Sequence, residues 1–134
     1  MKLRILHADD DILFSGIVSR ILRQSGFEVF HAGDGEQAWL LFNEMRFDFC
    51  LLDVVMPGLD GIQLGKRIRA KDRGVPICFL SGEDGHWLEM QLTGCLSGTE
   101  FFCKTFNIRK LSDVLLHYFI TPPIMNQNDS YRQI

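Results

Sequence analysis

The chain has 134 residues, which fits one domain, and 46% of them are hydrophobic and 23% charged, so a packed core is expected rather than disorder. The net charge of −3 argues against a nucleic-acid-binding face on this domain, because phosphate binding needs clustered Lys and Arg. No apolar run approaches the ~20 residues of a membrane span, and the aspartates at 9–11 interrupt any signal-peptide core. We therefore expect a cytoplasmic protein that does not bind a membrane.

Segments with strand and helix patterns alternate along the chain. Apolar runs bounded by turn residues predict five strands, and apolar residues at helical spacing predict five helices. In chain order the predicted strand–helix pairs are 3–8 and 12–24, 27–32 and 36–45, 48–53 and 62–71, 77–80 and 86–96, and 101–103 and 108–120. Prolines at 122 and 123 end the last helix, so residues 1–121 are expected to form the domain and residues 122–134 a linker or tail.

This alternation predicts an α/β fold with a five-stranded parallel sheet. The third and fourth strands are nearly all apolar, as expected for central strands covered on both faces. Parallel neighbours need right-handed helical crossovers, which produce an open, doubly wound sheet. In such sheets ligands bind beyond the carboxyl ends of the strands.

The cysteines and histidines show no spacing that indicates a metal site. We expect reduced core thiols, rather than a disulfide or a metal set, at Cys50, Cys78, Cys95 and Cys103. Structural roles are expected for the histidines, which lie on different elements: His7, His31, His86 and His117.

Polar residues stand at the carboxyl ends of four predicted strands. They are Asp9, Asp10 and Asp11 after the first strand, Asp53 at the end of the third, Ser81 and Gly82 after the fourth, and Lys104 after the fifth. These groups are expected to meet at one edge of the sheet. Carboxylates ~4 Å apart repel by ~4 kcal/mol at an effective dielectric constant near 20, so positive charge must hold them together. Lys104 supplies one charge, and a divalent cation with oxygen ligands, such as Mg²⁺, would supply two more.

That combination of groups suits phosphoryl transfer. Asp53 could attack an activated phosphorus and form an acyl phosphate. The cation and Lys104 would neutralise phosphoryl oxygens, and the Ser81 hydroxyl would donate to another. Gly82 leaves room for the donor, and the Pro57-Gly58 turn steers the chain away from Asp53.

Each of these residues also has a structural interpretation. The aspartates at 9–11 could cap the helix that follows, with Asp11 the best placed to do so. Asp53 could be a turn residue, Ser81 part of a plain loop, and Lys104 a solvated surface side chain. Their joint occurrence at strand ends favours the functional interpretation over these alternatives.

The chain resembles the receiver domains of two-component response regulators over roughly residues 3–120. The resemblance is carried by residues 8–11 (ADDD), residues 51–61 (LLDVVMPGLDG), Ser81-Gly82 and residues 101–104 (FFCK). It implies a flavodoxin-like strand order 2-1-3-4-5 and phosphorylation of Asp53 by a sensor histidine kinase. It also implies a signalling domain, not an enzyme in the usual sense, that assists its own phosphorylation and dephosphorylation.

The resemblance further assigns ligands to the metal. Asp10, Asp53 and the backbone carbonyl of Val55 would bind Mg²⁺, with Asp9 acting through water.

An alternative function is a phosphohydrolase with an aspartyl nucleophile, which would typically have a carboxylate two residues after the nucleophile. Val55 occupies that position here, which argues against such an enzyme.

The resemblance also implies a conformational switch. Ser81 and Phe101 would form the switch pair, which alters the face made by the fourth helix, the fifth strand and the fifth helix. That face would control the affinity of the domain for its partners, among them a second copy of the chain. It could instead control a DNA-binding domain that follows Ile134 and regulates transcription.

Three departures from the family pattern bear on the switch. Thr105 replaces the usual proline, and a cis bond before a non-proline residue costs ~3–4 kcal/mol. The Lys104–Thr105 bond is therefore either trans, which aims Lys104 less reliably, or cis and strained. The loop at 97–100 is one residue shorter than the commonest pattern of the family. Phe101 stands where the family usually has tyrosine and lacks its hydroxyl, so the Phe101 side chain is either a core ring or a mobile switch ring. The alternative function is a receiver-like interaction module that no longer accepts phosphate.

Overall fold

The computed structural model describes residues 2–81, 100–104 and 113 of the chain, and for residues 81 and 100–104 it describes the strand backbone. The predicted helix at 86–96, residues 97–99 of the predicted loop at 97–100, the predicted helix at 108–120 apart from residue 113, and the tail at 122–134 lie outside the described residues.

Strands and helices alternate in the described chain as the sequence predicts. Each predicted boundary agrees with the structure to within one residue. No helix in the described ranges is long and apolar enough to cross a membrane. The elements are β1 (Arg4–Ala8), α1 (Ile12–Gln24), β2 (Glu28–Ala32), α2 (Gly35–Glu44), β3 (Phe49–Asp53), α3 (Gly61–Lys71), β4 (Ile77–Ser81) and β5 (Glu100–Lys104).

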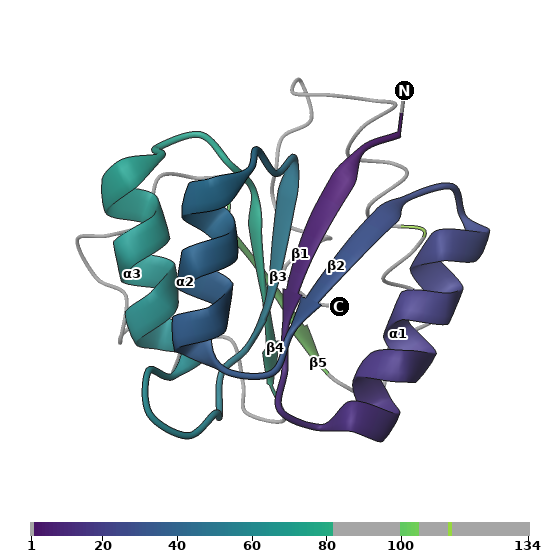
Figure 1. Ribbon diagram of the computed structural model, residues 1–134, viewed down its shortest axis with the longest axis horizontal. Coiled ribbons are helices and arrows are strands. Elements are labelled where there is room, and N and C mark those ends of the chain that lie inside the picture. The colour runs from purple at the N-terminus through teal and green to yellow at the C-terminus, as the bar shows by residue number, and fades with distance from the viewer. Residues whose placement is uncertain (1, 82–99, 105–112, 114–134) are drawn as a thin grey trace.

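The five strands form one parallel sheet in the order β2-β1-β3-β4-β5, which confirms the predicted fold and strand order. α1 covers one face, and α2 and α3 lie side by side on the other (Figure 1). The chain reverses direction of winding between β1 and β3, because β2 lies to one side of β1 and the later strands lie to the other. This is the point at which open sheets of this kind bind their ligands.

Two hydrophobic clusters flank the sheet. On one face, strand residues such as Leu52 and Phe79 pack against residues of α2 and α3, including Leu64. On the other, Phe49 and Leu51 belong to a cluster with residues of α1. β3 contributes to both clusters, and its first four residues are buried, which explains its nearly unbroken apolar sequence.

Aspartates cap the three described helices. The carboxylates of Asp11, Asp34 and Asp60 each accept the backbone N–H three residues later, at 3.0, 2.8 and 2.8 Å. Asp60 forms a capping box, because the side chain of Gln63 accepts the Asp60 backbone N–H in return. The predicted cap at Asp11 is therefore confirmed.

α1 has apolar side chains on two faces. Val18 and Leu22 are fully buried against the sheet, whereas Leu13 is 82% exposed and Ile17 is 55% exposed. Ile12, at the start of the helix, is 78% exposed. Helical spacing predicted the helix correctly, but it did not distinguish the face that packs from the face that does not.

Candidate metal centre

Three carboxylates meet at the carboxyl edge of the sheet. Oxygen atoms of Asp9, Asp10 and Asp53 all lie within 4.8 Å of one another. β1 and β3 are neighbours with Ala8 opposite Leu52, so the residues that follow, Asp9 and Asp53, leave the sheet side by side. Asp9 is buried, Asp10 exposed and Asp53 half-buried, which makes one side of the cluster open to solvent. The predicted convergence of these residues is therefore confirmed.

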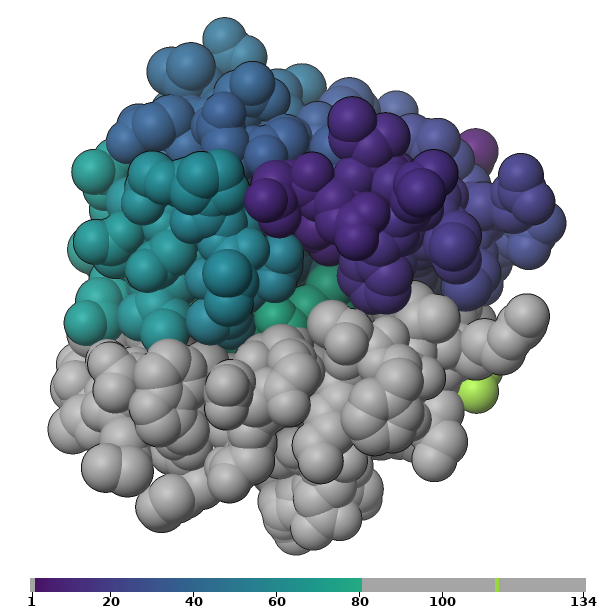
Figure 2. All heavy atoms as spheres, turned by 90° about the horizontal axis from the view of Figure 1, so that it is seen from below, coloured from purple at the N-terminus to yellow at the C-terminus, as the bar shows by residue number. Residues whose placement is uncertain are grey.

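Figure 2 views the molecule onto this edge. Purple atoms from the segment around the start of α1 and teal atoms from the segment after β3 lie on either side of green atoms near residue 80. The exposed side of the carboxylate cluster belongs to this surface.

Asp9 is fixed by several contacts. Its Oδ1 accepts the backbone N–H of Asp11 at 2.9 Å, and its own N–H donates to the Ala32 carbonyl at 3.0 Å. Its carbonyl oxygen lies 2.8 Å from His31 Nε2, and its Oδ2 lies 3.5 Å from His7 Nε2. The Asp9 side chain is only 2% exposed, so its carboxylate is buried at the carboxyl edge of the sheet.

Asp53 has an unusual acidity. Burial, together with the negative charges of Asp9 and Asp10 and a hydrogen bond with Asp9, raises the pKa of Asp53 to about 7. The backbone N–H of Val55, 3.3 Å from Asp53 Oδ1, lowers the pKa and only partly opposes these effects. A nearby cation would favour the charged form, so the cluster has the electrostatic character of a cation site.

The loop after Asp53 is folded tightly against β3 and β4. The Val54 N–H donates to the Leu80 carbonyl at 3.1 Å, and the Gly61 N–H donates to the Val54 carbonyl at 3.1 Å. A Cβ at Gly61 would collide with the Asp53 carbonyl oxygen, so α3 begins closer to Asp53 than any other residue type would allow. Gly58, in the predicted Pro57-Gly58 turn, has φ of +73°, a conformation that favours glycine.

The backbone also places the predicted phosphate-binding residues at this edge. Asp53 is opposite Leu80 in register, and Ser81 is opposite Lys104 at the ends of β4 and β5. Phe101 is opposite Cys78, three residues before Lys104. The side chains of Ser81, Phe101 and Lys104, and all of Gly82 and Thr105, lie outside what the structure describes, as does the Lys104–Thr105 bond.

The donor set fits Mg²⁺. Three carboxylates offer hard oxygen ligands within a small space, and Mg²⁺ is usually held by one or two carboxylates plus waters and phosphate oxygens. Val55, whose carbonyl was predicted as a ligand, is 75% exposed on the loop beside Asp53. The residues present can therefore hold the predicted cation.

Sequence reasoning did not predict the contact between His7 and Asp9. His7 was grouped with the other histidines as a structural residue, yet it is fully buried and adjoins the metal-site carboxylate. The period of two along a strand could have revealed it, because residues 7 and 9 project to the same face.

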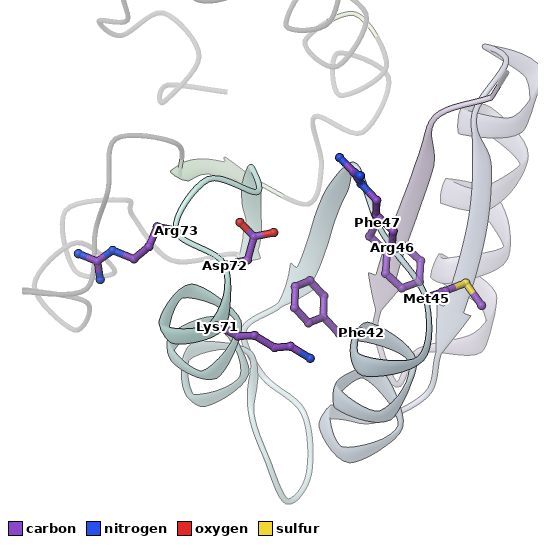
Figure 3. A pocket seen from close by; sticks show the side chains of 7 residues that line it. All are labelled: Phe42, Met45, Arg46, Phe47, Lys71, Asp72 and Arg73. Carbon is purple, nitrogen blue, oxygen red and sulfur yellow. The ribbon is translucent and has the colours of Figure 1, made fainter.

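A separate open pocket of about 340 Å³ lies at the opposite edge of the sheet, where α2 and α3 end. Lys71 points toward Phe42 there, whereas Arg73 points away from it (Figure 3). The remaining lining residues are Met45, Arg46, Phe47 and Asp72. Its position separates it from the carboxylate cluster.

The doubly wound sheet, with an acidic cluster at its carboxyl edge, defines a class of α/β domain whose ligands bind at that edge. Residues 5–116 match the family described as the response regulator receiver domain. The chain belongs to this family, which is a family of signalling domains in two-component systems and not a classical enzyme family.

Individual relatives and structures agree with this membership. The transcriptional regulatory protein YbdJ of Bacillus subtilis is 30% identical over 122 residues, 88% of this chain and 53% of YbdJ. The chain thus spans about half the length of that curated relative. The fold is similar to that of Vibrio cholerae chemotaxis protein CheY4 (28% identity, TM-score 0.78, 87% of this chain and 98% of that one). It is also similar to the Thermotoga maritima response regulator TrrA solved with Mg²⁺ and BeF (28% identity, TM-score 0.74, 87% and 97% covered).

Proposed function

We propose that this chain is a Mg²⁺-dependent phosphoacceptor switch that a sensor histidine kinase phosphorylates on Asp53. The observation that carries the proposal is the cluster of three carboxylates, from two neighbouring strands, with oxygens within 4.8 Å. Membership of the receiver family and the similarity to TrrA, a protein solved with Mg²⁺ and BeF, support it.

In this proposal Asp10, Asp53 and the Val55 carbonyl bind Mg²⁺ directly, and Asp9 acts through water. Bound Mg²⁺ would offset the repulsion between the carboxylates and neutralise phosphoryl oxygens. The chain itself supplies orientation, because the Val55 N–H donates to Asp53 Oδ1 at 3.3 Å.

Phosphorylation is then a transfer between two protein side chains. A carboxylate oxygen of Asp53 bonds to phosphorus as the bond from phosphorus to the kinase histidine nitrogen breaks. Lys104 and Ser81 bind phosphoryl oxygens, and Gly82 leaves space for the donor. The same groups assist the phosphorylation and dephosphorylation of the domain itself. The backbone register, with Ser81 opposite Lys104 at the carboxyl edge, supports this assignment.

The proposed output is a change in partner affinity. The acyl phosphate carries about −1.5 to −2 charge in place of the single charge of the Asp53 carboxylate, and Ser81 and Phe101 respond to it as the switch pair. The face that includes β5 then changes its affinity for partners, a second copy of the chain among them. We place the receiver domain at residues 1–121 and a linker at 122–134. The name of YbdJ, a transcriptional regulatory protein, and its greater length support an effector that regulates transcription.

The experiment compares the native chain with Asp53→Asn during titration with beryllofluoride and Mg²⁺. Beryllofluoride mimics a phosphoryl group on a carboxylate, so we expect a change in tryptophan fluorescence in the native chain and none in Asp53→Asn. Asp34→Asn is the matched control, because Asp34 caps α2 outside the cluster and asparagine caps equally well. No response in the native chain would favour the interaction module that does not accept phosphate.

A further inference from the structure

His7 is an unusual residue for an interior strand of a parallel sheet. It lies on β1 between β2 and β3, opposite His31 and Leu51, and its side chain is 0% exposed. Neither ring nitrogen has a hydrogen-bond partner within the described part of the chain. A buried polar group without a partner costs ~1–3 kcal/mol, so this position calls for a physical reason.

A carboxylate of the candidate metal centre lies beside the His7 ring. Nε2 lies 3.5 Å from Asp9 Oδ2, whereas the other Asp9 oxygen already accepts the Asp11 N–H. His7 and Asp9 project to the same face of β1, since they are two residues apart.

The His31 ring limits how His7 can turn. The two ring centroids are 5.8 Å apart with an interplanar angle of 60°, an edge-to-face arrangement. His31 is itself held at the site, because its Nε2 lies 2.8 Å from the Asp9 carbonyl oxygen. The side chain of Asp9 is thus bounded by the Asp11 amide on one oxygen and by the His7 ring on the other.

We propose that His7 is a positioning residue for Mg²⁺ binding: its Nε2–H donates to Asp9 Oδ2 and holds this carboxylate toward the cation. The inference rests on the proposed function, in which Asp9 belongs to the Mg²⁺ site. The 3.5 Å separation is longer than a hydrogen bond, and such contacts commonly shorten when the site binds its ligand. Groups that orient a metal ligand in this way typically contribute 10–100-fold in metal affinity.

The test measures Mg²⁺ dissociation constants by calorimetry for the native chain and three variants. His7→Leu removes both nitrogens but keeps a buried side chain, and we expect its affinity to fall about tenfold or more. His7→Gln keeps an amide N–H near the position of Nε2 and is expected to restore most of the affinity. Ile5→Val is the matched control, because Ile5 is fully buried on the same strand and face, two residues earlier.

A second measurement is independent of affinity. Nitrogen-15 NMR of the His7 ring in the native chain is expected to show the proton on Nε2; a proton on Nδ1 would overturn the proposal. Unchanged affinity in His7→Leu, equal losses in His7→Leu and His7→Gln, or a similar loss in Ile5→Val would also overturn it. If the native chain itself binds no Mg²⁺, the proposed function fails, and the NMR result still decides whether His7 donates to Asp9.

Discussion

Asp53 is half-buried, and oxygen atoms of its carboxylate and of those of Asp9 and Asp10 all lie within 4.8 Å of one another. An aspartate in the unfolded chain has a pKa of about 3.9, whereas burial and the two neighbouring charges raise the pKa of Asp53 to about 7 in the fold. The folded protein therefore binds a proton more tightly than the unfolded chain does. Without metal, the charged form of Asp53 opposes folding.

The first prediction concerns the pH dependence of this effect. Because the folded pKa exceeds the unfolded one, stability that comes from protonated Asp53 is fully present below about pH 4 and is lost as the pH rises toward 7. Asp53→Asn removes the titrating charge. In the presence of a metal chelator, we expect the free energy of unfolding of this variant to rise relative to that of the native chain between pH 5 and pH 8. The difference should reach a plateau above about pH 7. Urea denaturation followed by circular dichroism measures the difference.

Saturating Mg²⁺ should abolish or reverse this advantage, because the cation stabilises only the charged native site. Asp34→Asn, outside the cluster, should show a difference from the native chain that does not vary with pH in the same way. A stability gain of Asp53→Asn that is equal at pH 5 and pH 8 would contradict the electrostatic explanation.

The identities of these residues were predictable, but their environments were not. Asp9, Asp10 and Asp53 could be brought together from the sequence, because carboxyl ends of neighbouring parallel strands share an edge. The period of two along a strand places residues 7 and 9 on one face, but it does not give the burial of Asp9 or the distance between His7 and its second oxygen. Those depend on which side chains fill the space above β1, which only packing in three dimensions determines.

Helix α3 is positioned by a close backbone contact and not only by its apolar face. A Cβ on Gly61, its first residue, would collide with the Asp53 carbonyl oxygen and approach the Cα of Val54 to 2.9 Å. Both neighbours are backbone atoms of the segment that carries Asp53, so neither can move without moving this residue. The start of α3 and the end of β3 are therefore mechanically coupled.

The second prediction is that Gly61→Ala destabilises the fold by about 1–3 kcal/mol, the usual cost of forcing a methyl group into filled space. It should also weaken Mg²⁺ binding, because relief of the collision displaces Asp53. Thermal unfolding and calorimetric titration measure the two effects.

Gly16→Ala provides the matched control for this substitution. Gly16 lies on the exposed side of α1, and an added Cβ would meet no atom within 4 Å. Alanine there should stabilise the chain by about 0.5–1 kcal/mol through helix propensity and leave Mg²⁺ binding unchanged. Similar effects from both substitutions would argue against the specific role of the Gly61 contact.

The limits of the elements were largely predictable because they depend on local chemistry. Asp11 caps α1 and Gly26, with φ of +97°, follows its end, and both are signals that a sequence displays directly. The exposure of Leu13 and Ile17 was not predictable in this way. Helical spacing shows which residues share a face, but the neighbour of that face depends on tertiary packing.

Among the described residues, two hydrophobic clusters lie on opposite faces of the sheet, and β3 lies at its centre between β1 and β4. Cys50 is fully buried in this strand, opposite Leu6 on one side and Ile77 on the other. Exposure of its sulfur requires the separation of β3 from its neighbours or of the sheet from its helices. We therefore infer that Cys50 reports on unfolding of the whole described core.

The third prediction is that alkylation of Cys50 proceeds only through global unfolding. The thiolate is the reactive form, and burial raises the pKa of Cys50, so the native thiol is both inaccessible and protonated. A stability of about 5 kcal/mol would slow the reaction roughly 10³–10⁴-fold relative to the unfolded chain. Mass spectrometry of the peptide that contains Cys50, sampled across a urea series, should give the same unfolding free energy as circular dichroism. Modification that is fast in the native protein, or independent of urea, would mean that β3 opens locally, and the rigid placement of Asp53 at its end would then have to be abandoned.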